Sequence, residues 1–157
     1  MRTIQLTQGQ VALVDDEDYG FLMRYKWFVH PRPKGEWMAR GYVDGKEVLM
    51  HRLILNAPAG LTVDHINHNQ LDNRRSNLRL CTQGENDRNK RKFKGQSRYK
   101  GVTPCGHKWR AWISLGGRSA YLGTRATEEE AAQLYNEAAI EHYGEFAWLN
   151  DLSEVAG

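Results

Sequence analysis

The sequence predicts an α+β protein in three parts: a β-rich N-terminal section, a strand–loop–strand–helix unit, and a three-stranded antiparallel sheet packed on one helix. Three observations predict this fold class. Short runs with strand-like alternation, broken by turn residues, fill the first third of the chain. A dense polar loop separates two apolar runs between residues 61 and 81. The run after Thr127 has helical spacing and follows three further strand-like runs.

The N-terminal section, residues 3–55, is expected to consist of short strands. A turn is expected at Asp44-Gly45, a pair of residues that favours tight hairpins. The strand-like runs are TIQLTQ, QVALVD, the polar-aromatic stretch DYGFLMRYKWFVH, EWMARGYV and KEVLMHRLIL.

The middle of the chain predicts a hairpin followed by a short helix. The run LTVDH reads as a strand that ends at Asp64-His65, INHNQLDNRRS as a polar loop, and NLRLC as a strand that pairs back on the first. Thr82-Gln83-Gly84-Glu85 has the spacing of a capping box, so a helix is expected to begin there and to carry Asn86 in its first turns.

The C-terminal part predicts a sheet covered by one helix. Residues 89–97, NKRKFKGQS, have no apolar period and read as a connector. The runs YKGVTP, HKWRAWISL and SAYLGTR then read as strands with glycine-bearing turns between them. Thr127 to Glu130 form a second capping box, and Gly144 ends the helix. The stripe expected to cover the sheet is Ala131, Leu134, Tyr135, Ala138 and His142.

The net charge of +3 hides a segregated basic segment. Residues 74–110 contain twelve Lys or Arg against Glu85 and Asp87, a balance of +10, so the rest of the chain carries −7. Cations gathered in this way favour a polyphosphate partner, because each cation placed on a phosphate releases counterions. The alternative for KRKFKGQSRYK alone is a solvated linker that is basic by chance.

Other composition features exclude several classes. Cys81 and Cys105 are the two cysteines and form no CxxC, which argues against a disulfide framework and a thiolate zinc site. No apolar run is long enough for a membrane span, and MRTIQLTQGQ lacks the layout of a signal peptide. We therefore expect a soluble, intracellular protein that does not bind a membrane.

The hairpin and the short helix can bring Asp64, His65 and Asn86 around one point. A carboxylate and an amide oxygen are hard ligands that suit Mg²⁺, or Mn²⁺, with water and phosphate completing the shell. Neutral His65 can accept a proton from an attacking water. Asn77, on the opposite side of the hairpin, is the candidate to orient the imidazole ring. Singly, each of these residues is more often a turn former than a site residue.

These residues resemble the HNH endonucleases of the phage homing type, which have a ββα-metal site. The motifs are His51-Arg52-Leu53, Val63 to Asn67, Leu71 to Arg74, Asn77-Leu78-Arg79 and Glu85-Asn86, with LTQGQVALVDDEDY and YKW upstream. The resemblance implies that Asp64 and Asn86 bind the metal, that His65 is the general base and that Asn77 orients it. His68 departs from the family, which often has glycine there, and reads either as an exposed loop residue or as a group near the phosphate.

Residues 97–150 resemble the AP2 DNA-binding domain, through SRYKGV, KWRAWI, YLGT and the run that follows. In that family the sheet lies in the major groove of DNA. Thr103 and Ser114 depart from the plant-type pattern, where arginines are usual, so the base preference does not transfer. Trp109 is expected to pack on the helix. The positions that match DNA contacts of the family are Lys100, Gly101, Trp112 and Tyr121. Charge adds Arg74, Arg75, Arg79, Lys90, Arg91, Lys92, Arg98, Lys108, Arg110 and Arg118.

Together the sequence predicts a metal-dependent DNA endonuclease that nicks double-stranded DNA, with a nuclease domain at residues 1–92, a basic linker at 93–97 and an AP2-like domain at 98–151. We expect a monomer, encoded by a phage or prophage and acting in the bacterial cytoplasm. One alternative is a DNA-binding transcriptional regulator whose nuclease site is inactive. An RNA-binding module is the other, although the chain has no RNP or KH motif.

Overall fold

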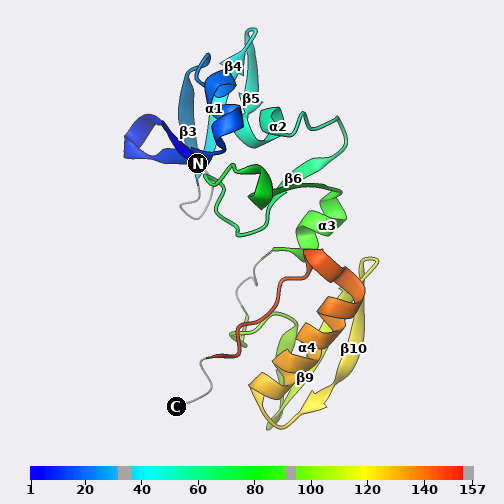
Figure 1. The fold of residues 1–157 in the computed structure, drawn as a ribbon. Helices are drawn as coiled ribbons and strands as arrows, with labels where there is room; N and C mark the ends of the chain where they lie inside the picture. The colour runs from blue at the N-terminus through cyan, green and yellow to red at the C-terminus, as the bar shows by residue number, and fades with distance from the viewer. Residues whose placement is uncertain (32–36, 91–94, 154–157) are drawn as a thin grey trace. The chain divides into compact units, whose positions relative to one another are not determined.

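The computed structural model describes residues 1–31, 37–90 and 95–153 and has the predicted α+β composition. The chain divides into two compact units, Met1–Asn86 and Asp87–Gly157 (Figure 1). The division falls inside helix α3 (Gln83–Arg88), earlier than the domain boundary expected at residue 92. The whole of the expected connector, residues 89–97, therefore follows α3 in the sequence.

Three small antiparallel sheets form the first unit. Strand β1 pairs with β2, strands β3, β4 and β5 form the second sheet, and β6 pairs with β7. Asp44 (φ 50°) and Gly45 (φ 73°) form the expected turn between β4 and β5. The strands are β1 (Arg2–Gln5), β2 (Val11–Val14), β3 (Trp27–Pro31), β4 (Trp37–Val43), β5 (Lys46–Leu49), β6 (Thr62–His65) and β7 (Leu78–Cys81). The short 3₁₀ helices are η1 (Thr7–Gly9) and η3 (Arg75–Asn77).

Two helices stand where the sequence predicted strands. Helix α1 (Asp16–Leu22) occupies the start of the polar-aromatic stretch, with Asp15 before it and three acidic residues in its first turn. Acidic side chains in that position interact favourably with the positive end of the helix dipole. Helix α2 (Met50–Ile54) takes the second half of KEVLMHRLIL. A short apolar run fits a strand or a buried helix equally well, so periodicity alone could not separate the two.

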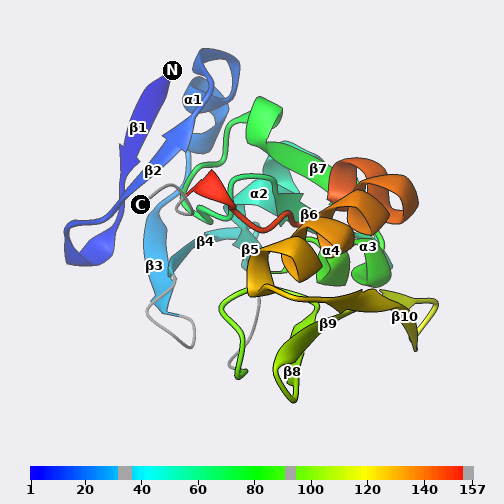
Figure 2. The ribbon, with the colours of Figure 1, turned by 90° about the horizontal axis from the view of Figure 1, so that it is seen from below.

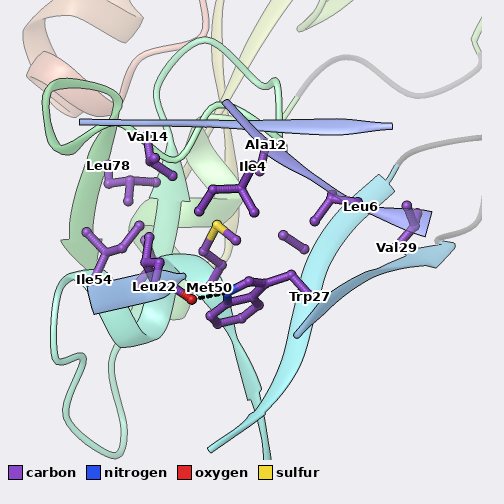
Figure 3. Close-up of a cluster of buried hydrophobic side chains, with 12 residues drawn as sticks. Ile4, Leu6, Ala12, Val14, Leu22, Trp27, Val29, Met50, Ile54 and Leu78 are labelled. Atoms are coloured by element: carbon purple, nitrogen blue, oxygen red, sulfur yellow. Dashed lines mark hydrogen bonds between the residues drawn. The ribbon is translucent and has the colours of Figure 1, made fainter. Parts of the chain in front are cut away.

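The core of the first unit is shared by all of its parts. Figure 3 shows Met50 of α2 between Trp27 of β3 and Ile4 of β1. The Trp27 indole Nε1 donates to the Leu22 carbonyl at 2.9 Å. Val63 and Leu78, from the β6–β7 hairpin, belong to the same buried cluster. The β-rich N-terminal section and the strand–loop–strand unit are therefore one folded body.

A backbone bridge joins β2 to the loop between β6 and β7. The Leu13 amide donates to the Leu71 carbonyl at 2.8 Å, and the Asn73 amide donates to the Leu13 carbonyl at 2.8 Å. Leu13 and Asp72 form an isolated parallel bridge in this way. The N-terminal section thus fixes the path of the polar loop through main-chain hydrogen bonds.

The second unit has the expected sheet and helix. Strands β8 (Val102–Cys105), β9 (Lys108–Leu115) and β10 (Arg118–Arg125) form an antiparallel sheet with β9 in the middle. Helix α4 (Glu128–Tyr143) lies across one face of this sheet (Figures 1 and 2). The capping box predicted at Thr127 and Glu130 is present in both directions. The short 3₁₀ helix η4 (Gly144–Phe146) follows α4.

Packing between α4 and the sheet confirms most of the predicted stripe. Ala131, Tyr135 and Ala138 are buried, whereas His142 is exposed and Tyr143 takes the buried position beside it. The stripe therefore drifts by one residue at the end of the helix, because the 3.6-residue turn does not repeat exactly every seven residues. Trp109 packs against the cluster of Val102, Ala111 and Ala131, as predicted.

Candidate active site

The end of strand β6 places Asp64 and His65 side by side in sequence at the mouth of the polar loop. In the hairpin register Asp64 lies opposite Arg79 and His65 opposite Leu78. Both polar side chains are buried, with residue exposures of 5% and 6%. Buried polar groups of this kind must be bonded within the protein, so their partners define the site.

The His65 ring is held by a hydrogen bond and a ring contact. Its Nε2 lies 3.2 Å from the Asn73 Oδ1, and its ring meets the His51 ring edge to face with centroids 5.0 Å apart. Burial lowers the pKa of His65, an effect that the Asn73 bond and the nearby carboxylates only partly oppose. The imidazole is thus kept neutral near pH 7. Since an amide oxygen only accepts, Nε2 carries the proton and Nδ1 keeps its lone pair, with which it can accept a proton.

Asn77 was expected to orient the imidazole, but among the described residues both ends of its side-chain amide bond within the loop and neither bonds to the ring. Its Oδ1 accepts from the Asn67 amide at 2.9 Å, and its Nδ2 donates to the Asp72 carbonyl at 2.8 Å. The Asn77 carbonyl also accepts from the Ile66 amide at 2.9 Å. Asn77 therefore ties the two ends of the loop together and positions the ring only through the backbone.

Asn73 is the residue that the sequence reasoning missed. It lies in the Leu71 to Arg74 motif, where we read the polar residues as loop formers. The place of Asn73 in that motif could have marked it as a site residue. The spacing alone, however, does not show whether Asn73 or Asn77 is the partner of His65. The difference arises from the bridge to β2, which turns Asn73 inward.

The Asp64 carboxylate is paired with Arg79 inside the protein. Arg79 donates to the Asp64 Oδ2 from Nε at 2.9 Å and from Nη2 at 2.7 Å. Only 11% of the Arg79 side chain is exposed. Arg79 was expected to contact DNA, and the structure instead places it on a predicted metal ligand.

Helix α3 carries Asn86, the other predicted ligand. The capping box is present, since Glu85 Oε2 accepts from the Thr82 amide at 2.8 Å and the Glu85 amide donates to Thr82 Oγ1 at 3.3 Å. Thr62 pairs with Cys81, so the first turn of α3 follows directly from the hairpin end where β6 begins. Asn86 is half-buried one helical turn after Thr82.

The donor types of Asp64 and Asn86 fit a hard divalent cation such as Mg²⁺ or Mn²⁺. Within residues 1–31, 37–90 and 95–153, no group of three or more His, Cys, Asp or Glu is placed to bind a metal ion. A carboxylate with an amide oxygen is the sparse protein shell that Mg²⁺ accepts, because this ion keeps several waters and binds phosphate oxygens. The ion pair with Arg79 shows that the Asp64 carboxylate already binds one cationic group in the folded chain.

Two further arginines of the loop are bonded to carboxylates of the first unit. Arg74 donates to buried Asp72 from Nε at 2.7 Å and from Nη2 at 2.6 Å, and this contact is the main cause of the lowered pKa of Asp72. Arg75 donates to buried Asp18 from Nε and Nη2, both at 2.8 Å, and to the Ile54 carbonyl. The DNA contacts expected of Arg74 and Arg75 stay predictions. Each arginine would have to bind a phosphate as well as its carboxylate.

Several cations of the second unit are also engaged. Lys100 donates from Nζ to the carbonyls of Arg88 and Lys90 at 2.6 and 2.8 Å, and burial lowers its pKa to about 8. Arg98 pairs with Glu129. Lys90 pairs with Asp87. Arg91 and Lys92 lie outside the described residues.

Gly101 has a packing role in the structure. Its φ is +75°, and a Cβ atom there would lie 2.1 Å from the Tyr135 Cδ2. The Gly101 carbonyl also accepts from the Trp112 amide at 2.7 Å. Only glycine permits this close approach between the chain before β8 and helix α4.

The face of the β8–β10 sheet opposite α4 carries all of the remaining predicted DNA contacts except Arg118. Trp112 and Tyr121 are cross-strand partners with ring centroids 5.2 Å apart. Arg118 pairs with Leu115, so by strand alternation it lies on the α4 side of the sheet. It is exposed at the end of strand β10. We call the face opposite α4 the open face; by strand alternation its residues are Thr103, Cys105, Lys108, Arg110, Trp112, Ser114, Ser119, Tyr121 and Thr124.

The two cysteines are free thiols. Cys81 is buried in β7, and burial raises its pKa to about 11, so it is an unreactive core residue. Cys105 is half-buried. In the described part of the chain, no helix is both long enough and apolar enough to cross a membrane.

Comparison with known proteins gives matches for both units. A family model described as HNH endonuclease matches residues 56–88, the segment that contains the hairpin, the loop and α3. An uncharacterized HNH endonuclease of Acanthamoeba polyphaga mimivirus is 33% identical over 155 residues, which cover 92% of this chain and 77% of that protein.

The second unit matches part of two plant proteins, both from Arabidopsis thaliana. An AP2-like ethylene-responsive transcription factor is 47% identical over 55 residues, and another ethylene-responsive transcription factor is 44% identical over 61 residues. These matches cover 32% and 36% of this chain but only 16% and 14% of the two factors. The likeness is therefore confined to one module.

Proposed function

Because this chain belongs to the HNH endonuclease family, we propose that it hydrolyses phosphodiester bonds of double-stranded DNA and nicks one strand at a time. The observation that carries the proposal is the buried, neutral His65 ring with its Nδ1 left as the base, next in sequence to a buried carboxylate. One such site per chain supports a single-strand cut by a monomer.

In the proposed reaction a water molecule attacks phosphorus while the bond from phosphorus to the 3′ oxygen breaks. His65 accepts the proton of the water at Nδ1, and its ring becomes an imidazolium. The neighbouring carboxylates Asp64 and Asp72 favour this charge, since both raise the pKa of His65. The leaving 3′ oxygen takes a proton from solvent water, which gives a 5′ phosphate and a 3′ hydroxyl, and His65 returns its proton to solvent.

Asp64 and Asn86 would hold the divalent cation, Mg²⁺ or Mn²⁺. When bound, the cation supplies positive charge against the phosphate and the leaving 3′ oxygen. Binding requires Asp64 to be shared with Arg79 or released by it. A freed Arg79 would be a cation beside the phosphate, which is consistent with its expected DNA contact.

The open face of the second unit is proposed to bind the duplex and to guide the nuclease, as in a homing-type enzyme. Its exposed Arg110 and Lys108 can pair with phosphates, and Trp112 with Tyr121 can contact base edges and sugars. The AP2-like likeness supports DNA as the ligand. Action in a bacterial cytoplasm, from a phage or prophage gene, stays a prediction.

The deciding experiment incubates the full chain with supercoiled plasmid and Mg²⁺ or Mn²⁺, with EDTA as the control. We expect conversion to open-circular DNA with either ion and none with EDTA. Linear product appearing together with open-circular DNA would indicate double-strand cleavage instead. No cleavage of DNA that the protein binds, with any divalent ion, would contradict the nuclease proposal.

The second candidate function is a DNA-binding transcriptional regulator with an inactive nuclease site. The Arg79–Asp64 ion pair favours it, because a permanently paired Asp64 would bind no metal. Isothermal titration of Mn²⁺ separates the two: binding near one ion per chain supports the nuclease, and an absence of binding supports the regulator.

A further inference from the structure

We propose that Asn73 is the positioning residue that fixes the tautomer and orientation of His65, and that strand β2 holds Asn73 in place for this purpose. The inference rests on the proposed function, in which His65 is the general base. It gives the N-terminal β-rich section an indirect part in catalysis, through Asn73.

The first argument is the contact itself. Asn73 Oδ1 lies 3.2 Å from the His65 Nε2, and Asn73 has no exposed surface. An accepting oxygen at Nε2 requires the hydrogen to be there, which leaves Nδ1 unprotonated. No other hydrogen bond to the described His65 ring competes with this choice. Asn73 therefore decides which nitrogen can take a proton from water.

The second argument is the other end of the same amide. The Asn73 Nδ2 is buried and has no hydrogen-bond partner among the described residues. A buried donor without a partner is unfavourable, so an amide at this position is a poor choice for stability alone. An apolar side chain of similar size would avoid that penalty. A role toward His65 accounts for the asparagine.

The third argument is the way the backbone of Asn73 is fixed. Its amide donates to the Leu13 carbonyl of β2 at 2.8 Å. The preceding Asp72 is bonded to Arg74 through both carboxylate oxygens, and its carbonyl accepts from Asn77 Nδ2. Bonds on both sides leave Asn73 little freedom to turn its side chain away from the ring.

The fourth argument is the ring contact on His65. His51 of α2 packs edge to face on it, with an interplanar angle of 87°. This contact limits the tilt of the His65 ring, whereas a hydrogen bond at Nε2 sets its rotation about the side-chain axis. Asn73 and His51 thus constrain different motions, so His51 does not replace Asn73.

The test uses ¹⁵N chemical shifts of the His65 imidazole in the full chain, which report the tautomer without DNA or metal. We expect the Nε2–H form in the wild-type protein. Asn73→Leu, of similar size, should give a mixture of tautomers and lower the nicking kcat by about 10- to 100-fold, a typical loss for a positioning partner. The plasmid KM should change by less than about threefold, because binding groups are untouched.

Two variants complete the test. Asn73→Asp keeps an accepting oxygen, so it should retain the Nε2–H form and nick faster than Asn73→Leu. Asn69→Ala is the matched control: the exposed Asn69 accepts from the Leu71 amide in the same loop but does not touch His65. It should keep both the tautomer and the nicking rate.

The proposal is wrong if wild-type His65 carries its proton on Nδ1, or if Asn73→Leu loses no more activity than Asn69→Ala. Should Asn73→Leu fail to fold by circular dichroism, the wild-type tautomer and the Asn73→Asp variant still decide. A chain that never nicks, yet keeps the Nε2–H form only when residue 73 has an accepting oxygen, would support the positioning role and refute the nuclease function.

Discussion

In the first unit, the polar side chains Asp64, His65 and Asp72 are buried and bonded to neighbours, whereas in the second unit Arg110, Trp112 and Tyr121 lie on the sheet face opposite helix α4. The first arrangement fixes the shape of a reaction site. The second leaves a surface open to a ligand.

The difference teaches how a basic residue should be interpreted. Arg74, Arg75 and Arg79 each have a carboxylate of the first unit within ion-pair distance. Among the described residues, Arg110 of the open face has no comparable ion pair. A lysine or arginine in the sequence is therefore a good candidate for a phosphate contact only where the fold places no carboxylate of the same protein beside it.

The largest effect is expected from replacing His65, the proposed general base of the first unit. His65→Ala should lower nicking by about 10² to 10⁴, the usual contribution of a positioned proton acceptor. DNA affinity, measured by gel mobility shift, should stay within a few-fold because the open face is intact. A loss below tenfold would point to another base, and His68→Ala would then test the nearest alternative.

Gly101 tests whether a residue assigned to DNA from the family resemblance is structural instead. Gly101→Ala should destabilise the second unit by about 2 to 4 kcal/mol, because its Cβ would overlap Tyr135 at a positive φ. Gly106→Ala is the control: its φ is also positive, but its Cβ would meet open space, so a cost of about 1 kcal/mol is expected. Urea unfolding measures both, and equal losses would contradict the packing role.

Arg75 tests the same point in the first unit. Arg75→Ala leaves buried Asp18 without its bidentate partner and should lower the free energy of unfolding by about 2 to 3 kcal/mol. The exposed pair of Arg2 with Asp16 gives the matched control, since solvent screens that pair and Arg2→Ala should cost much less than Arg75→Ala. Thermal unfolding measures the difference. A stable Arg75→Ala variant that binds DNA weakly would restore the original assignment.

The smallest effect is expected on the open face. Arg110→Ala should leave stability unchanged and reduce the slope of log affinity against log salt by about 1, as expected for one lost phosphate contact. Arg118→Ala, whose register is that of the α4 side, should change the slope less. Fluorescence anisotropy over a salt series measures both slopes. A larger effect from Arg118 would move the DNA-binding surface to the end of the sheet.

The sequence predicted those elements whose signals are local. The hairpin at Asp64-His65, both capping boxes and the sheet of the second unit follow from residue spacing, and the structure confirms them. Helices α1 and α2 were missed because short apolar runs do not distinguish a helix from a strand. The family of the nuclease was also predicted from motif residues, and the mimivirus relative confirms it.

The side-chain partners in the site could not be predicted in the same way. The choice between Asn73 and Asn77 as the partner of His65 depends on Leu13, which is remote in sequence. The pairing of Arg79 with Asp64 depends on the hairpin register, which a one-residue shift would change completely. Partners that depend on register and on distant contacts need the folded chain.

The bridge between Leu13 and Asp72 also sets when the site can form during folding. Its two residues are 59 positions apart, so the hydrogen bonds at Leu13 close a long loop of chain. Closing such a loop has an entropic cost, and contacts of this kind form slowly compared with a helix. On refolding, helix α4 should regain its circular dichroism early, whereas nicking should return only after β2 has joined the loop. Strand β2 can therefore fix the position of Asn73, and through it the His65 ring, only after the chain around Asp72 has been synthesised.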